Sequence, residues 1–388
     1  MTIILNSATI ITPKKMIKKG IIVVSEEGRL DYIGEASRAP QVKGQSIDLK
    51  DKIVAPGFID IHVHGGKGVA FGMDNLAEGL TTYSNWVVGS GVTGFLCTIT
   101  GPNADSIYKL IEDYVPLFEK GVTGAEALGL HIEGPFLNPE KKGAFNPTWL
   151  RAPELSEALN YLKLGKGWIK QMTLAPELPH AADIAAYYRK AGVAVALGHS
   201  NTDYETASAA LNGDFTHVTH TFNAQSSFSH RAPGVMGAVM ASQGVTGELI
   251  GDGVHVHPGA MKILYRCLGS ERISLITDAI PGAGLEDGEY NLIGQHVTVL
   301  NGKATLDDGT IAGSTAQLNL CVNNMHHWTE ASLAEAIQMA SLIPAQIIRM
   351  EKEMGSLEKG KLANLIVIDE EVNIYLTMVR GKIVHCLI

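Results

Sequence analysis

Short apolar runs alternate with amphipathic segments over most of the chain. Eight runs of strand length lie between Pro56 and Met354: residues 58–65, 93–100, 128–134, 169–177, 193–200, 216–224, 247–255 and 273–279. Helical patterns that end at or near a glycine, a residue suited to a C-cap, fill connections such as 183–192, 203–213 and 258–269. Eight buried strands alternating with helices over about 250–300 residues predict an α/β fold, a (β/α)8 TIM-like barrel.

The rival topology is a doubly wound open sheet, but no GxGxxG follows the first run. Both ends of the chain differ from the middle. They carry β-branched runs joined by turn residues, with no room for crossover helices: 2–11, 20–25, 360–369, 373–381 and 382–388. We therefore expect a small β-sandwich domain built from residues 1–54 and 356–388, with the barrel at 55–355.

Composition narrows the class of protein. The 388 residues are 45% hydrophobic and 18% charged, and 31 Lys+Arg against 40 Asp+Glu give a net charge of −9 without a basic cluster. Nucleic acid and anionic membranes are therefore not expected partners. Four scattered cysteines and the absence of a signal peptide or of a run of about 20 apolar residues predict a cytoplasmic protein.

Two histidines end the first run of the predicted barrel. His62 and His64 are two residues apart, so on a strand both imidazoles point to the same side. Gly65 and Gly66 then break the strand. A pair of this kind is a candidate for metal binding, and an ordinary strand with two hydrogen-bonded histidines is an equal alternative.

Further metal-competent residues follow other runs. Glu133, His199 and His220 stand at three strand ends, where a barrel places side chains on its C-terminal face. Each alone is more typical of a surface or capping group, but together they form a His2Glu set that can hold a divalent cation. His217 is left out, because its odd spacing from His220 predicts that it faces the opposite side.

Asp278 ends the eighth run. It could be the N-cap of a following helix. The functional alternative is stronger, because a carboxylate beside an activated water can accept the proton of that water and return it to a leaving group. Hydrolysis of a stable amide needs both steps.

Several longer motifs point to a family. The order PGFIDIHVHG, HIEGPFLN, GHSN, HTFNA, HRAPG, DGVHVHP and ITDA, with the tail GSLEKGKLANLIVID, resembles the amidohydrolase superfamily. More narrowly it resembles the N-acetylglucosamine-6-phosphate deacetylases, for which HIEGPF, GHSN and HTFNA are specific. The resemblance covers nearly the whole chain. It implies a hydrolase that removes the acetyl group of N-acetylglucosamine 6-phosphate, and a homodimer.

The resemblance also implies roles for single residues. Glu133, His199 and His220 would hold a metal, and a chain that keeps both His62 and His64 would bind a second one bridged by the glutamate. Asp278 would lie at the metals as general base and acid. The sugar and its phosphate would be bound by further residues: Asn223, Ala224, Arg231, which in some relatives reaches from a neighbouring subunit, and His255. His257, two residues on, would be a capping or surface group.

The sequence does not determine which metal is bound or how many ions there are. Imidazole and carboxylate ligands suit several divalent ions, so we expect one or two ions, zinc or iron first and manganese or cobalt as alternatives. The chain also departs from the family. Phe145 stands where a histidine usually orients the acyl carbonyl, and a phenyl ring cannot donate that hydrogen bond. Gln225 and Ala232 replace the usual residues of NAM and HREPG, and we expect both to lie near the sugar.

Three rival functions stand beside this one, and the departures from the family motivate the third. The substrate could be N-acetylgalactosamine 6-phosphate, or the enzyme could hydrolyse a cyclic amide on the same scaffold. A non-catalytic protein that binds an amino-sugar phosphate is the third rival. It would leave a complete set of metal ligands and Asp278 unexplained.

Overall fold

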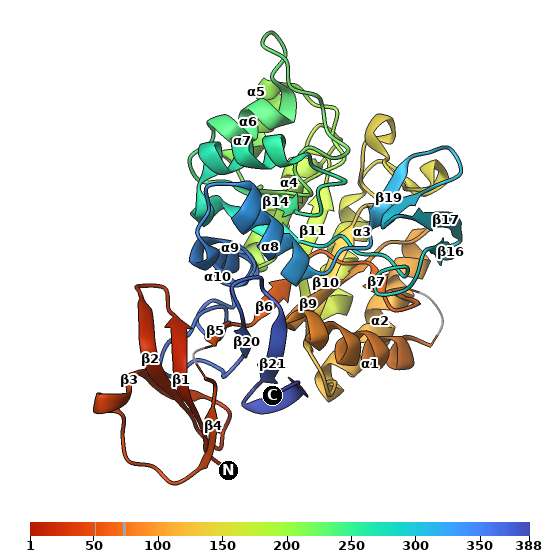
Figure 1. Ribbon diagram of the computed structural model, residues 1–388. Coiled ribbons are helices and arrows are strands. Elements are labelled where there is room, and N and C mark those ends of the chain that lie inside the picture. The colour runs from red at the N-terminus through yellow and green to blue at the C-terminus, as the bar shows by residue number, and fades with distance from the viewer. Residues whose placement is uncertain (51, 73–74) are drawn as a thin grey trace.

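A parallel sheet of eight strands forms the centre of the molecule (Figure 1). The computed structural model describes residues 1–50, 52–72 and 75–388. In spatial order the strands are β15 (Ile273–Ile276), β14 (Thr246–Ile250), β13 (His217–Val218), β12 (Ala194–Leu197), β11 (Ile169–Leu174), β10 (Glu126–Glu133), β9 (Val92–Ile99) and β6 (Phe58–Asp60). Each lies within or overlaps one of the eight predicted runs, so the predicted barrel is confirmed.

The two end strands of this path meet through the residues that follow them. The Asp278 backbone N–H donates to the His62 carbonyl at 2.9 Å, and the Thr277 hydroxyl donates to Asp60 Oδ2 at 2.6 Å. The sheet is therefore nearly closed, and the carboxyl ends of its parallel strands share one rim.

Helices cover the outside of the barrel (Figure 1). The predicted helical segments at 183–192, 203–213 and 258–269 correspond to α4, α5 and α7, and α2 begins with a capping box from Asn103 and Ser106. The helices are α1 (Leu76–Val87), α2 (Ala104–Lys120), α3 (Leu155–Gly165), α4 (Ala181–Lys190), α5 (Tyr204–Leu211), α6 (Gly234–Ala241), α7 (Pro258–Leu268), α8 (Leu318–Trp328), α9 (Leu333–Met339) and α10 (Leu342–Ile347). None of the described helices combines the length and apolarity needed to cross a bilayer.

Both ends of the chain form a second sheet of eight strands, and both termini lie at that end of the molecule (Figure 1). Val54, Val367 and Leu376 belong to its separate apolar core. The predicted β-sandwich from both chain ends is consistent with this arrangement. The strands are β22 (Lys382–Cys386), β21 (Ile374–Val379), β20 (Leu365–Ile368), β5 (Ile53–Pro56), β1 (Ile3–Ile11), β2 (Met16–Val24) and β3 (Leu30–Glu35), with β4 (Gln45–Asp48) paired to β1.

A third sheet was not predicted. Four antiparallel strands lie between β15 and α8 and have a small apolar core around Val297 and Val299. Dipeptides such as Asn301-Gly302, a typical hairpin turn, were the available sequence signal. The strands are β16 (Gly288–Leu292), β17 (Gln295–Leu300), β18 (Lys303–Thr305) and β19 (Ile311–Ser314), and a small ribbon joins β7 (Gly65–Gly66) and β8 (Val69–Ala70).

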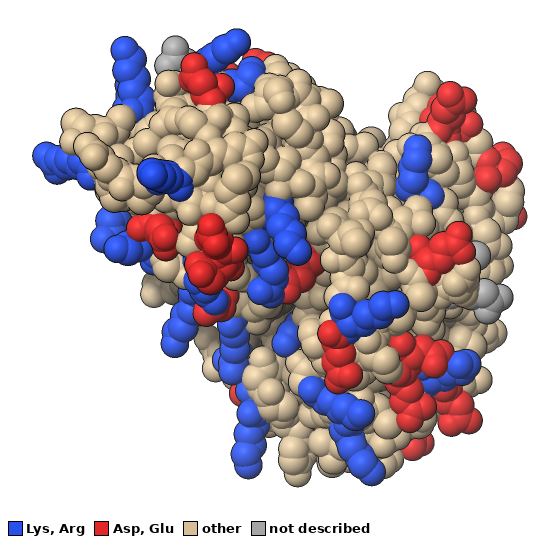
Figure 2. All heavy atoms as spheres, turned by 90° about the horizontal axis from the view of Figure 1, so that it is seen from below, with Lys and Arg blue, Asp and Glu red and all other residues tan. Residues whose placement is uncertain are grey.

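Charged side chains are dispersed over the lower face of the molecule. Figure 2 shows Lys and Arg interspersed with Asp and Glu, with uncharged surface between them. This mixture agrees with the absence of a basic cluster in the sequence.

Candidate metal centre and active-site cavity

Two groups of metal-competent side chains meet at the carboxyl rim of the barrel. His62, His64 and Asp278 form one group, and the ligand atoms within it lie within 4.8 Å of one another. Glu133, His199 and His220 form the second group by the same measure. All six side chains are buried. The structure thus brings together every residue that the sequence singled out for metal binding.

Glu133 connects the two groups. Its Oε2 lies 3.1 Å from His64 Nε2 and 3.4 Å from His62 Nε2. Its Oε1 lies 3.1 Å from His199 Nε2 and 3.2 Å from His220 Nε2. One carboxylate oxygen therefore faces each group, which is the arrangement that a bridging ligand needs.

Three of the six residues adopt a left-handed backbone conformation just beyond the strand ends. The φ angles are +48° at His199, +26° at His220 and +51° at Asp278. A non-glycine residue in this region costs about 1–3 kcal/mol and persists where the surrounding contacts hold it, commonly at functional sites. This backbone turns the side chains over the rim of the barrel.

Charge and burial oppose each other within the centre. Burial favours neutral Glu133, but the charge of His62 and hydrogen bonds from His199 and His220 hold the pKa of Glu133 well below its usual range. Burial likewise opposes ionisation of Asp278, yet His62 and His64 lower its pKa. Burial disfavours charged His64, but hydrogen bonds to Asp278 and Glu133 raise its pKa to about 9. Glu133 and Asp278 therefore stay ionised only because positive charge lies beside them in the centre.

The donor set fits a divalent cation. Among the described residues, His62 Nε2 is buried and has no hydrogen-bond partner, although it faces Glu133 and Asp278. The nitrogens His199 Nε2 and His220 Nε2 lie only 3.0 Å apart. A cation binds imidazole in its neutral form, so it replaces protons and compensates the carboxylates at the same time.

A cavity of about 320 Å³ opens above these side chains. Its lining includes His64, Asp278 and three of the residues assigned to the substrate: Asn223, Ala224 and His255. His255 Nδ1 lies 2.7 Å from Asp252 Oδ2, and although burial opposes the charge, this contact raises the pKa of His255. His257 instead accepts a hydrogen bond from the Gly259 N–H at the start of α7, as a capping residue does.

Three other residues named from the sequence do not line the cavity. Arg231 is exposed on the loop between β13 and α6, outside the cavity of this single chain. Gln225 and Ala232, which were expected near the sugar, do not line the cavity of this chain either. Gln225 is buried and donates to the Thr219 carbonyl at 2.8 Å, whereas Ala232 is exposed on the same loop as Arg231.

Phe145 does line the cavity. Its ring meets the His199 ring edge to face, with the centroids 5.1 Å apart. Gly143, two residues earlier, has φ +56°, and a Cβ there would lie 3.2 Å from His199 Cε1. This loop also supplies the Lys141 carbonyl that accepts from His199 Nδ1 at 2.8 Å, so it packs directly on a predicted metal ligand.

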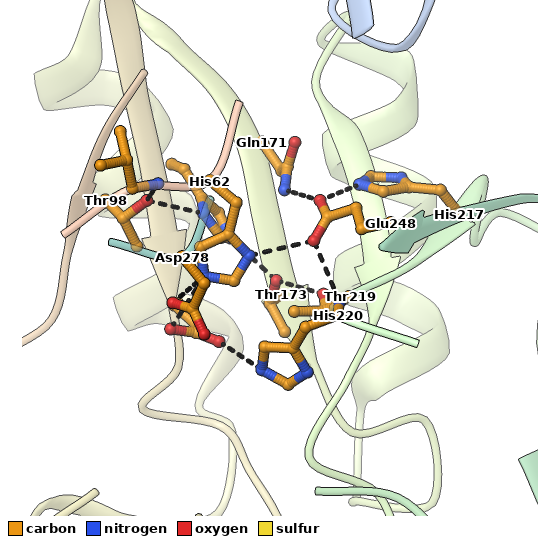
Figure 3. A network of polar contacts seen from close by, with 12 residues as sticks. His62, Thr98, Gln171, Thr173, His217, Thr219, His220, Glu248 and Asp278 are labelled. Carbon is orange, nitrogen blue, oxygen red and sulfur yellow. Dashed lines mark hydrogen bonds and ion pairs between the residues drawn. The ribbon is translucent and has the colours of Figure 1, made fainter. Parts of the chain in front are cut away.

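His217 belongs to neither ligand group, as expected, but the alternation argument used to exclude it does not apply here. Strict alternation would turn it away from His220, but β13 ends at Val218 and the chain turns before His220. His217 is buried, and its Nε2 lies 3.4 Å from Glu248 Oε1 (Figure 3). Glu248 was missed altogether. The signal was a single acid in the apolar run GELIG, a position where a buried carboxylate needs partners.

The unpredicted sheet forms part of the cavity wall. Leu292, Ile293 and Ile311 from this segment line the cavity with Phe145. Gly313 allows the sheet to approach the catalytic rim, because with φ +65° a Cβ would lie 2.8 Å from the Asp278 carbonyl oxygen. The Ser314 backbone N–H then donates to the Asp278 carbonyl at 2.8 Å, and the Ser314 carbonyl accepts from the Ile280 N–H at 3.0 Å.

Comparison with known proteins gives the family. The profile of the amidohydrolase family matches residues 53–384. The chain belongs to the amidohydrolase family. This amidohydrolase is 33% identical to an N-acetylglucosamine-6-phosphate deacetylase of Bacillus subtilis (strain 168), over 98% of this chain and 97% of the relative.

Solved structures agree with that comparison. An N-acetylglucosamine-6-phosphate deacetylase from Pasteurella multocida matches with a TM-score of 0.91 and 30% identity over 99% of each chain. One from Mycobacterium smegmatis, solved in complex with N-acetyl-D-glucosamine-6-phosphate, matches with a TM-score of 0.90 and 28% identity, again over 99% of each chain. Amidohydrolases of this family depend on metals, which agrees with the two ligand groups in this chain.

Proposed function

We propose that this amidohydrolase removes the acetyl group of N-acetylglucosamine 6-phosphate and releases glucosamine 6-phosphate and acetate. One observation carries the proposal. Glu133 joins two groups of buried metal ligands, and Asp278 lies at the floor of a cavity large enough for a small ligand. The relatives from Bacillus subtilis, Pasteurella multocida and Mycobacterium smegmatis, each matched over nearly the whole chain, are named for this deacetylation and support the choice of substrate.

The metal ligands have distinct assignments in this proposal. Glu133, His199 and His220 would hold one divalent cation, and His62, His64 and Asp278 would hold a second, with Glu133 lying between the two groups. Zinc or iron is proposed first, with manganese or cobalt as alternatives. When bound, such ions supply Lewis-acid polarisation of a carbonyl group and make water more acidic.

Asp278 moves the proton. Its pKa is lowered by His62 and His64 against the effect of burial, so its carboxylate is ionised at neutral pH. The carboxylate accepts a proton from the water whose oxygen bonds to the acetyl carbon. It then donates this proton to the amide nitrogen as the carbon–nitrogen bond breaks, so acetate and a free amine leave.

Other residues bind the sugar. His255 is oriented by Asp252 and presents its ring to the cavity, while Asn223 and Ala224 form the adjoining edge. No lysine or arginine among the described residues lines the cavity. We therefore propose that Arg231, exposed on its loop, binds the phosphate in the cavity of a second copy, with the chain acting as a homodimer. Its planar guanidinium suits a phosphate dianion.

A cytoplasmic location completes the proposal. The four cysteines are unpaired, two of them buried and two exposed, which suits a reducing compartment.

The decisive experiment measures acetate release and bound metal on the same purified sample. The substrates are N-acetylglucosamine 6-phosphate, N-acetylgalactosamine 6-phosphate, unphosphorylated N-acetylglucosamine and a cyclic amide. We expect fastest turnover of the first, loss of turnover after chelation, and recovery when a divalent metal is returned. Faster turnover of another substrate would overturn the assignment, and binding without acetate release would make the protein a sensor.

A further inference from the structure

A buried carboxylate lies behind the metal ligands. Glu248, on β14, is fully buried and belongs to neither ligand group. Figure 3 shows one carboxylate oxygen facing His62 and the other facing both Gln171 and His217. Its Oε2 lies 3.0 Å from His62 Nδ1 and 3.1 Å from the His220 backbone nitrogen. Its Oε1 lies 2.7 Å from Gln171 Nε2.

These contacts determine which nitrogen of His62 carries a proton. The Gln171 amide and the His220 N–H both donate to Glu248, so both carboxylate oxygens act as acceptors. His62 Nδ1 must then donate to Glu248. Its other nitrogen, Nε2, points at Glu133 Oε2 and Asp278 Oδ1, at 3.4 and 3.5 Å. In the neutral ring this nitrogen carries the lone pair that a cation requires.

The second ligand group is oriented differently. His199 Nδ1 contacts the Lys141 backbone carbonyl at 2.8 Å, which is a neutral partner. His62 is instead oriented by a carboxylate. A carboxylate partner raises the basicity of a ligating imidazole more than a neutral partner, and outer residues of this kind commonly contribute about 10–100-fold to metal affinity.

We propose that Glu248 is a positioning residue that determines whether the His62, His64 and Asp278 group holds a second cation. The inference rests on the proposed metal centre and goes beyond it, because it makes occupancy of one site depend on a residue outside that site. The Glu133, His199 and His220 group keeps its cation without Glu248. Glu248 thus acts through His62 and does not contact the substrate.

A purely structural role of Glu248 can be distinguished from a positioning role by a control variant in the same network. Gln171 shares the Glu248 network through Oε1, and within the described residues it makes no hydrogen bond to His62. Replacing Gln171 therefore disturbs the same buried network on the side away from the metal ligands. This residue offers a matched control for the loss of buried hydrogen bonds.

The test compares five variants as full chains: Glu248→Gln, Glu248→Leu, Gln171→Leu, His62→Gln and the double variant of Glu248→Gln with His62→Gln. Each metal-free protein is titrated with zinc against a competing chelator, which yields stepwise binding constants, and its melting temperature is measured without metal. Glu248→Gln keeps an acceptor and loses the charge, so the weaker constant should fall about 10-fold. Glu248→Leu loses both, so that constant should fall about 100-fold.

The tighter constant should stay within about threefold in Glu248→Gln, because the amide oxygen still accepts from the His220 N–H of the other ligand group. Gln171→Leu should lower the melting temperature and leave both constants unchanged. Adding Glu248→Gln to His62→Gln should change neither constant further. If Glu248→Leu does not fold, Glu248→Gln alone carries the test.

Several outcomes would overturn the inference. Unchanged constants in Glu248→Gln, an equal loss at both sites, an equal loss in Gln171→Leu, or a wild-type chain that binds a single zinc would each do so. A wild-type chain that binds no divalent metal would overturn the proposed function itself. Two sites in the wild type with no response in the Glu248 variants would overturn only the inference.

Discussion

The floor and the wall of the cavity are built in different ways. The floor consists of His, Glu and Asp side chains from the ends of barrel strands, each buried among several polar partners. The wall contains apolar side chains such as Leu292 and Ile311 from the unpredicted sheet, together with Phe145 from a loop. The loop that carries Arg231 extends away from both.

This difference separates reaction from substrate choice. A floor residue has a fixed orientation, because Glu133 contacts four histidines and His62 is held by Glu248 from behind. A wall residue mainly provides shape, so it can change without disturbing the ligands. In a (β/α)8 barrel the strand ends carry the chemistry and the loops vary with the substrate. Changes to the floor should therefore cost far more than changes to the wall.

The largest effect is expected at Asp278. Asp278→Asn removes the proton acceptor, so kcat should fall by about 10³-fold or more. The cation of the other ligand group, measured by elemental analysis, should remain, because Glu133, His199 and His220 are intact. Turnover within tenfold of the wild type would show that Asp278 is not the base.

Asp60→Asn is the matched control for that variant. Asp60 is buried beside Thr277 but does not line the cavity, and burial raises its pKa to about 7. Its carboxyl is therefore partly protonated near neutral pH, so an amide is a close substitute. We expect this variant to keep kcat within about tenfold, since the proton-transfer group itself remains.

The residues of the cavity floor could be predicted from the sequence, because they stand at the ends of recognisable strands. Apolar runs identify the strands, and parallel strands of a barrel end at one rim, so Glu133, His199 and Asp278 had to meet there. Their local geometry could not be predicted. Alternation failed for His217, because β13 ends at Val218 and the left-handed backbone at His220 follows no period-two rule.

The wall of the cavity could not be predicted from the sequence, for a different reason. Its sheet is an insertion whose position depends on tertiary contacts, such as the close approach at Gly313. Gln225 and Ala232 do not line the cavity of this chain, because closeness in sequence to Asn223 does not give closeness to the cavity. Whether Arg231 reaches a second copy depends on assembly, which a single chain does not encode in its pattern.

Arg231→Ala should have the next largest effect. Loss of a guanidinium contact to phosphate should raise KM for the phosphorylated sugar about 10–100-fold. The kcat value should change little, because Arg231 lies away from the floor. The neighbouring His230→Ala variant, on the same exposed loop, is the control and should keep its KM. An unchanged KM in Arg231→Ala would exclude the proposed phosphate contact.

Phe145→His tests the wall at its closest approach to the floor. An imidazole N–H beside the acyl carbonyl should raise kcat about 3–10-fold, less than the 10²–10³-fold lost when a preorganised donor is removed elsewhere. Phe145→Leu keeps an apolar side chain without a donor and should give no increase. Steady-state kinetics of both variants distinguish a donor effect from a change of shape. Equal rates in the two would show that hydrogen bonding at this position does not matter.

Gln225→Met should have the smallest effect, because this side chain does not reach the cavity. The variant loses the hydrogen bond to the Thr219 carbonyl, but it also removes a buried Oε1 that has no partner among the described residues. The two changes oppose each other, so the free energy of unfolding should shift by no more than about 1 kcal/mol. Because the wall and floor stay intact, kcat/KM should remain within about threefold, a margin far below the cost of losing a catalytic contact. A larger loss in kcat/KM with unchanged melting temperature would mean that the turn after His220 transmits small changes in packing to the metal ligands, and that the floor is less independent of its surroundings than its contacts indicate.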